Sequence, residues 1–131
     1  MITALVCVAL LGLLLFGLGF GVSMVRGRSG RNIGSSDDPT DPVYKIVRAH
    51  GNASEYIGMM AVLIVVLGTG TPSVWVTGAM IGATASRYLH AAGMLMSPTL
   101  DKPQPLRFAG ALGTYVFGLA LSIQLLMRAL G

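Results

Sequence analysis

Charged residues are scarce in this sequence. They make up 11% of its 131 residues, whereas water-soluble domains carry about 25%. Hydrophobic residues make up 53%, and the mean hydropathy is +0.73. A soluble domain of this length would need far more polar surface to cover its core. The composition therefore excludes a soluble fold and predicts an integral membrane protein.

Cysteine is nearly absent. The single Cys7 excludes an intramolecular disulfide and a cysteine-based metal cluster. His50 and His90 lie in different segments without a third ligand, so we expect no metal site. Phosphate-loop and dinucleotide-binding motifs are also missing. The only thiol, Cys7, lies in the first apolar block, where it is poorly solvated and resists ionisation. Any reactive sulfur should therefore come from a cosubstrate.

The basic balance of the chain does not indicate nucleic acid. The formal net charge is +4, but the basic residues lie mainly at the ends of apolar segments. Lysine and arginine in such places orient membrane helices and meet anionic lipid headgroups. We therefore expect a membrane and no nucleic acid as partner.

The apolar residues fall in four blocks, each long enough to cross a hydrocarbon core about 30 Å thick as a helix. Asp41 and Pro42 predict one helix start, because aspartate favours the N-cap and proline the first helical position. Glycine, serine and proline mark loops between the blocks. The sequence predicts one all-α domain over residues 1–131, an integral membrane four-helix bundle with helices at about 1–25, 42–68, 73–96 and 106–128.

The distribution of lysine and arginine predicts the orientation of these helices. The first and third loops hold most of them, whereas the other side has a neutral turn at 68–72 and Arg128. Cytoplasmic loops carry the excess of positive charge. We expect loops one and three in the cytoplasm and both termini on the opposite side.

Two pairs of glycines stand four residues apart: Gly17 with Gly21, and Gly78 with Gly82. Small residues at this spacing let helix backbones approach closely in lipid. The pairs predict a tightly packed bundle.

A set of polar residues lies within or beside the apolar blocks. Ionisable groups at membrane depth cost about 2.5–3.5 kcal/mol each on insertion scales, so they persist where they are paired, hydrated or used. Helical spacing places Arg48, Asn52 and Glu55 along one stripe of the second helix, with Tyr56 beside it. Arg87 and His90 share one face of the third helix. The set is Arg48, Asn52, Glu55, Tyr56, Arg87 and His90.

Two simpler interpretations explain part of this set. Arg48 is near the start of its helix and can extend to the cytoplasmic interface. Glu55 and Arg87 can neutralise each other between helices. The whole set describes a polar pocket open toward the cytoplasm. Because guanidinium groups favour carboxylates and a carboxylate favours an ammonium, a peptide-sized ligand with two carboxylates and an amino group, such as glutathione, matches it.

The run RAHGNASEY from Arg48 to Tyr56 resembles the second-helix signature of the MAPEG family. This family includes microsomal glutathione transferases, leukotriene-C synthases and prostaglandin E synthases. Its pattern is Arg, one residue, Gln or His, one residue, Asn, two residues, Glu, Tyr. The resemblance covers essentially the whole chain, but Gly58 replaces a common proline, and a frequent third-helix tyrosine is missing. Further similarities are Val43-Tyr44-Lys45 before the run, Arg26 after the first helix, and Arg87 with His90 on the third.

The resemblance implies a homotrimer that binds glutathione between neighbouring subunits, near the cytoplasmic side. It also implies that a cation near the start of the fourth helix stabilises the glutathione thiolate. Arg107 is the best counterpart, with Lys102 as second choice. The glutathione contacts that it implies are Arg26, Arg48, His50, Asn52, Glu55, Tyr56, Arg87 and His90.

The leading functional prediction is a membrane glutathione transferase or peroxidase that directs the thiolate at hydrophobic electrophiles or lipid hydroperoxides. The missing third-helix tyrosine leaves a second interpretation open, a non-catalytic MAPEG-like protein that binds glutathione or a lipid. A third is a small multidrug-type transporter, but such proteins use an acidic residue in the first helix, and residues 1–25 contain none.

Overall fold

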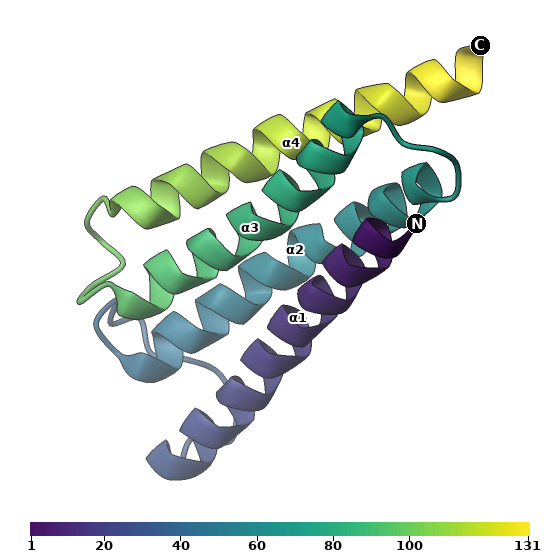
Figure 1. Ribbon diagram of the computed structural model, residues 1–131. Coiled ribbons are helices and arrows are strands. Elements are labelled where there is room, and N and C mark those ends of the chain that lie inside the picture. The colour runs from purple at the N-terminus through teal and green to yellow at the C-terminus, as the bar shows by residue number, and fades with distance from the viewer.

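The computed structural model describes residues 1–131 and contains four α-helices and no strand. The all-α four-helix bundle expected from the sequence is confirmed. Both termini and the short α2–α3 connection lie toward one end of the bundle, and the two long loops lie at the other (Figure 1). The helices are α1 (Ile2–Ser29), α2 (Pro42–Gly68), α3 (Val74–Met96) and α4 (Pro105–Leu130).

The first helix extends further than the sequence predicted. We expected an end near residue 25 and a loop from Arg26, but α1 continues to Ser29. It ends at Gly30, which has φ 68° and donates its N–H to the Arg26 carbonyl. Glycine adopts this left-handed conformation without steric cost, so it terminates the helix here. Arg26 therefore lies on α1, not in the loop.

The start of α2 follows the predicted capping pattern. The Asp41 side chain accepts a hydrogen bond of 2.8 Å from the Val43 N–H, and Pro42 is the first helical residue. Arg31 forms an ion pair with the same carboxylate. The hydrogen bond from Arg31, and next that from Val43, lower the pKa of Asp41 below its ordinary value. This pair fastens the first loop (30–41) to the second helix.

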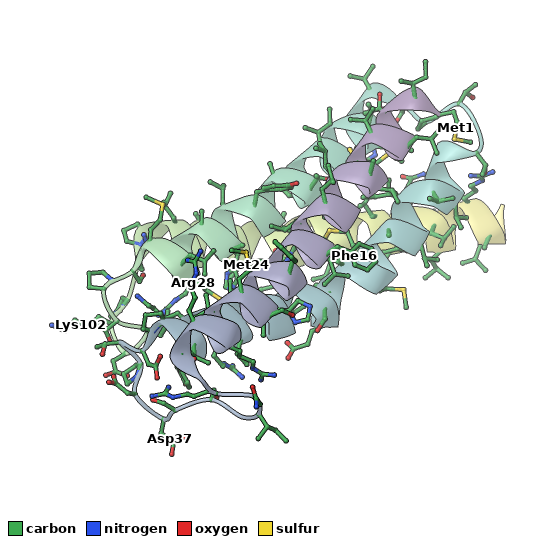
Figure 2. The ribbon with its side chains drawn as sticks, turned by 90° about the horizontal axis from the view of Figure 1, so that it is seen from below. Met1, Phe16, Met24, Arg28, Asp37 and Lys102 are labelled. Carbon is green, nitrogen blue, oxygen red and sulfur yellow. The ribbon has the colours of Figure 1, made fainter.

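The first and third loops (30–41 and 97–104) are joined to each other. The Leu100 N–H donates to the Pro39 carbonyl over 3.1 Å. The Lys45 ammonium at the start of α2 donates to the Ser97 carbonyl over 3.1 Å. Most of the charged groups gather at this end of the bundle, near Arg28, Asp37 and Lys102 (Figure 2). We call it the loop end.

Three of the four helices, α1, α2 and α4, are long and apolar enough to cross a membrane. Their outer faces carry large exposed apolar side chains, such as Phe16 and Leu119, which are 78% and 65% exposed. The exception is α3, because its apolar residues are interrupted by buried polar ones, including Arg87 and His90. A membrane crossing by α3 remains a prediction.

The helices pack as two closely joined pairs. α1 packs against α2 and also touches α3, whereas α3 packs most extensively against α4. α1 and α4 make no contact with each other. The fully buried core side chains come from all four helices and include Leu11, Ile64, Met80 and Leu121. The contact between α2 and α4 is the least extensive of the contacting pairs, so this side of the bundle is only loosely closed.

Glycine allows the close approach of α3 and α4. A Cβ atom at Gly110 would overlap the backbone of His90, and one at Gly82 would overlap the Phe117 ring. Gly21 likewise faces Ile46. The partners of these residues in the predicted pairs, Gly17 and Gly78, have no neighbour within 4 Å. The predicted close packing thus applies to one member of each pair.

Gly110→Ala should destabilise the protein because its new methyl group would meet the His90 backbone, which cannot move aside as a side chain does. Overpacking of this kind costs about 1–3 kcal/mol. Thermal unfolding of the detergent-purified protein would measure the effect. The matched control is Gly78→Ala on α3, which faces open space. It should be neutral or stabilising, since alanine favours helix. Equal melting temperatures for the two variants would contradict this account.

Candidate functional site

The site centres on a buried arginine. Arg87 on α3 is only 1% exposed. Its Nη2 donates to Asn52 Oδ1 on α2 over 2.6 Å, and its Nη1 donates to Thr114 Oγ1 on α4 over 3.2 Å. Its Nε is buried and has no partner. One guanidinium thus joins three helices and keeps an unused donor.

Two tyrosines complete the cluster. The Arg87 guanidinium carbon lies 5.1 Å from the centre of the Tyr56 ring, a distance at which a cation is attracted to an aromatic face. The Tyr56 hydroxyl lies 3.4 Å from the Tyr115 hydroxyl on α4. The two rings meet edge to face, with centroids 6.0 Å apart. The cation is therefore followed by a pair of phenols that leads from the core to the surface.

No carboxylate neutralises Arg87. The only ion pair in the chain joins Arg31 and Asp41. Glu55 is exposed and makes no hydrogen bond or ion pair within the chain. The interpretation of Glu55 and Arg87 as a structural ion pair is therefore wrong, because Glu55 points outward while Arg87 is held by neutral groups. An unpaired buried cation costs several kcal/mol, which an anionic ligand would recover.

A groove between α2 and α4 adjoins the cluster and holds a cavity of about 210 Å³. Its end nearer the loops is polar, with Glu55, Tyr56 and Tyr115. Further along both helices it becomes apolar, with Met59 and Leu119 among its lining residues. The groove therefore offers charge at one end and an apolar surface at the other.

His90 links the site to the third loop. It is buried, and its Nδ1 lies 3.0 Å from the Arg107 carbonyl oxygen on α4. A carbonyl only accepts, so Nδ1 carries the proton. The Arg107 guanidinium donates to the carbonyls of Leu100 and Lys102, over 3.1 and 2.9 Å. His90 and Arg107 line one cavity of about 410 Å³, together with Asp101 and other residues.

Three of the expected ligand contacts lie apart from the Arg87 cluster. Arg26 donates to the Gly34 carbonyl over 3.1 Å. Arg48 is exposed and has no partner within the chain. His50 packs against Gly19 of α1. The structure thus brings together Asn52, Tyr56, Arg87 and His90. It leaves Glu55 at the groove, Arg48 on the surface, Arg26 near the end of α1 and His50 against α1.

Two residues of the cluster were missed in the sequence. Thr114 is buried and Tyr115 is 53% exposed at the groove. Both lie on the mostly apolar α4, seven and eight residues after Arg107. Two helical turns therefore place them near the face of α4 that carries Arg107. Polar residues within an apolar block were the available signal.

The sequence profile of the MAPEG family matches residues 4–127, which include every residue of this cluster. The chain belongs to the MAPEG family. Among curated proteins, none matches it individually. Family membership and the apolar helices make it an integral membrane protein. Membership of the MAPEG family also connects the chain in general with glutathione or eicosanoid metabolism.

Arg87→Met should cost the ligand-free MAPEG protein less stability than Asn52→Ala does, although both variants lose the Arg87–Asn52 hydrogen bond. Methionine fills a similar volume, and the loss of the unpaired buried charge should offset the lost hydrogen bonds by about 1–3 kcal/mol. Asn52→Ala keeps the buried charge and removes a hydrogen bond to it worth about 1.5–3 kcal/mol. Thermal unfolding in detergent compares the two variants. A loss of stability in Arg87→Met as large as that in Asn52→Ala would show that Arg87 is held for structure.

Proposed function

We propose that the chain is a membrane glutathione transferase or peroxidase. It binds glutathione near the cytoplasmic side and directs the thiolate at hydrophobic electrophiles or lipid hydroperoxides. One observation carries this proposal: Arg87 is buried without a carboxylate partner and keeps a free Nε. A site built in this way is suited to an anion.

The surrounding groups suit both charges of glutathione. Its two carboxylates match the guanidinium groups of Arg87 and Arg48, whose planar donors bind carboxylates in pairs. Its ammonium matches Glu55, which is exposed at the groove and free of partners within the chain. Asn52 and Tyr56 supply neutral hydrogen bonds between these charges.

A site between two subunits of a homotrimer explains why the candidate contacts are separated in one chain. His50 and Asn52 are two residues apart on α2, so they point about 200° away from each other. His50 faces α1, whereas Asn52 faces Arg87. One ligand can touch both only if a second copy contributes the α1–α2 side. We therefore propose that Arg26 and His50 of one subunit meet the Arg87 cluster of its neighbour.

The thiol must lose its proton to react. A free thiol has a pKa near 8.5 and is mostly protonated at neutral pH, so a nearby cation increases the reactive thiolate. Arg107 is our candidate for this cation, because it lines the cavity beside His90 at the loop end. Lys102 is exposed on the third loop, just before α4, and is the second choice.

The first test is equilibrium binding of glutathione to the detergent-purified protein. We expect saturable binding that Arg48→Ala and Arg87→Met weaken at least about tenfold, since each removes a charged hydrogen bond worth roughly 1.5–3 kcal/mol. Arg28→Ala is the matched control, because Arg28 is an exposed arginine at the same end without a contact. No binding by folded wild-type protein, or equal losses in all three variants, would refute the glutathione site.

The second test separates an enzyme from a non-catalytic binder. Arg107→Ala should lower the rate of glutathione conjugation by about 100-fold or more, as loss of a group that stabilises a reacting charge does. Glutathione affinity should change little, because Arg107 is assigned to the thiol and not to the carboxylates. Arg107→Lys should restore part of the rate. A wild-type protein that binds glutathione but turns over neither electrophiles nor hydroperoxides would be the non-catalytic binder.

A further inference from the structure

Tyr115 occupies an unusual position in the groove between α2 and α4. Its side chain is 53% exposed there, while its hydroxyl lies 3.4 Å from that of Tyr56, behind which stands Arg87. It is therefore a phenol that reaches from a cationic cluster into a groove otherwise lined largely by apolar side chains. A hydrophobic molecule lying in the apolar part would bring its polar end to this hydroxyl.

The other hydrogen-bond donors of the groove are already engaged. The Thr114 hydroxyl donates to the Gly110 carbonyl over 2.7 Å, and the Ser122 hydroxyl donates to the Gly118 carbonyl over 2.8 Å. An ionised Glu55 has no proton to donate. Tyr56 and Tyr115 share one hydrogen bond, so one of their two protons remains free. When Tyr56 donates, the free proton is that of Tyr115, the more exposed phenol.

We propose that Tyr115 is a catalytic residue that donates a proton to the alkoxide released when a lipid hydroperoxide is reduced. This inference rests on the proposed glutathione function. The thiolate sulfur attacks the terminal oxygen of the hydroperoxide, an S–O bond forms, and the O–O bond breaks. Glutathione is oxidised to its sulfenic acid, and the departing alkoxide takes the Tyr115 proton to leave as the alcohol. A second glutathione converts the sulfenic acid to the disulfide and water, and solvent returns the proton to Tyr115.

The neighbours of Tyr115 fit this role. The phenolate left after proton transfer accepts the hydrogen bond of the Tyr56 hydroxyl. The positive charge of Arg87, over the face of the Tyr56 ring, also favours a negative charge beside it. Glu55 is the only carboxylate that lines the groove, and its side chain is exposed. The site can therefore hold a transient phenolate next to a fixed cation.

The two reactions of the enzyme differ in their need for a proton donor. An alkoxide needs a proton to leave, whereas the chloride released from an aryl chloride does not. Tyr115→Phe should therefore lower the turnover of a long-chain alkyl hydroperoxide by about 100-fold, the usual contribution of a general acid. Conjugation of glutathione to 1-chloro-2,4-dinitrobenzene should fall far less, because its chloride leaves without a proton. Tyr88→Phe is the matched control, because the Tyr88 hydroxyl donates to the Leu10 carbonyl outside this groove, and it should affect neither rate.

The outcomes distinguish this inference from the function on which it rests. Loss of hydroperoxide turnover alone, with glutathione affinity unchanged, supports Tyr115 as the proton donor. Equal losses of both rates, or no loss of either, would overturn it. Wild-type protein that conjugates glutathione without reducing hydroperoxides would also overturn it while the transferase function stands. Wild-type protein that binds no glutathione would instead refute the proposed function itself.

Discussion

The candidate site depends on one buried guanidinium. Arg87 bonds to α2 through Asn52 and to α4 through Thr114, and it lies against the face of Tyr56. These neutral partners orient the cation without cancelling its charge. Held in this way it is costly in a membrane and strongly attractive to an anion. The same contacts that join three helices therefore also create the potential that a ligand would use.

The packing of the helices decides where that potential can be reached. Because α1–α2 and α3–α4 are the tightly packed pairs, the α2–α4 side remains open beside Arg87. Gly110 keeps α4 close to His90, which in turn holds the Arg107 carbonyl. The loop end is thus positioned by the same contact that closes the α3–α4 pair. The cluster shares Tyr56, Thr114 and Tyr115 with the groove and His90 with the loop cavity, so the three lie next to one another along α4.

Much of the fold was readable in the sequence because the membrane imposes simple rules. The three strongly apolar helices α1, α2 and α4, and the Asp41-Pro42 start of α2, follow from hydropathy and capping alone. The end of α1 was placed too early, because Arg26 and Arg28 look like loop residues, whereas the left-handed Gly30 actually ends the helix. Charge composition predicts where lipid contact stops, and it does not fix where backbone hydrogen bonding stops.

The site was predictable only in part. Asn52, Tyr56, Arg87 and His90 stood out because polar groups are rare at that depth, and they do meet. The pairing of Glu55 with Arg87 was wrong, since spacing along α2 gives the stripe but not the direction in which it faces. Thr114 and Tyr115 were missed because a hydroxyl in an apolar helix carries no charge to signal its importance. Their role depends on the register of α4 against α3, which sequence periodicity leaves undetermined.

The polar character of α3 has a consequence for how the chain reaches the bilayer during synthesis. α3 alone among the four helices is not apolar enough to partition into lipid by length and composition. Its buried Arg87 gains a partner when Thr114 of α4 arrives, and its His90 and Ser86 lie against Gly110 and Gly113 of that helix. We therefore expect α3 to wait at the insertion machinery and to leave it as a hairpin with α4. Biogenesis of the second half of the protein would then be a single cooperative event, in which the Arg87 cation is inserted already shielded.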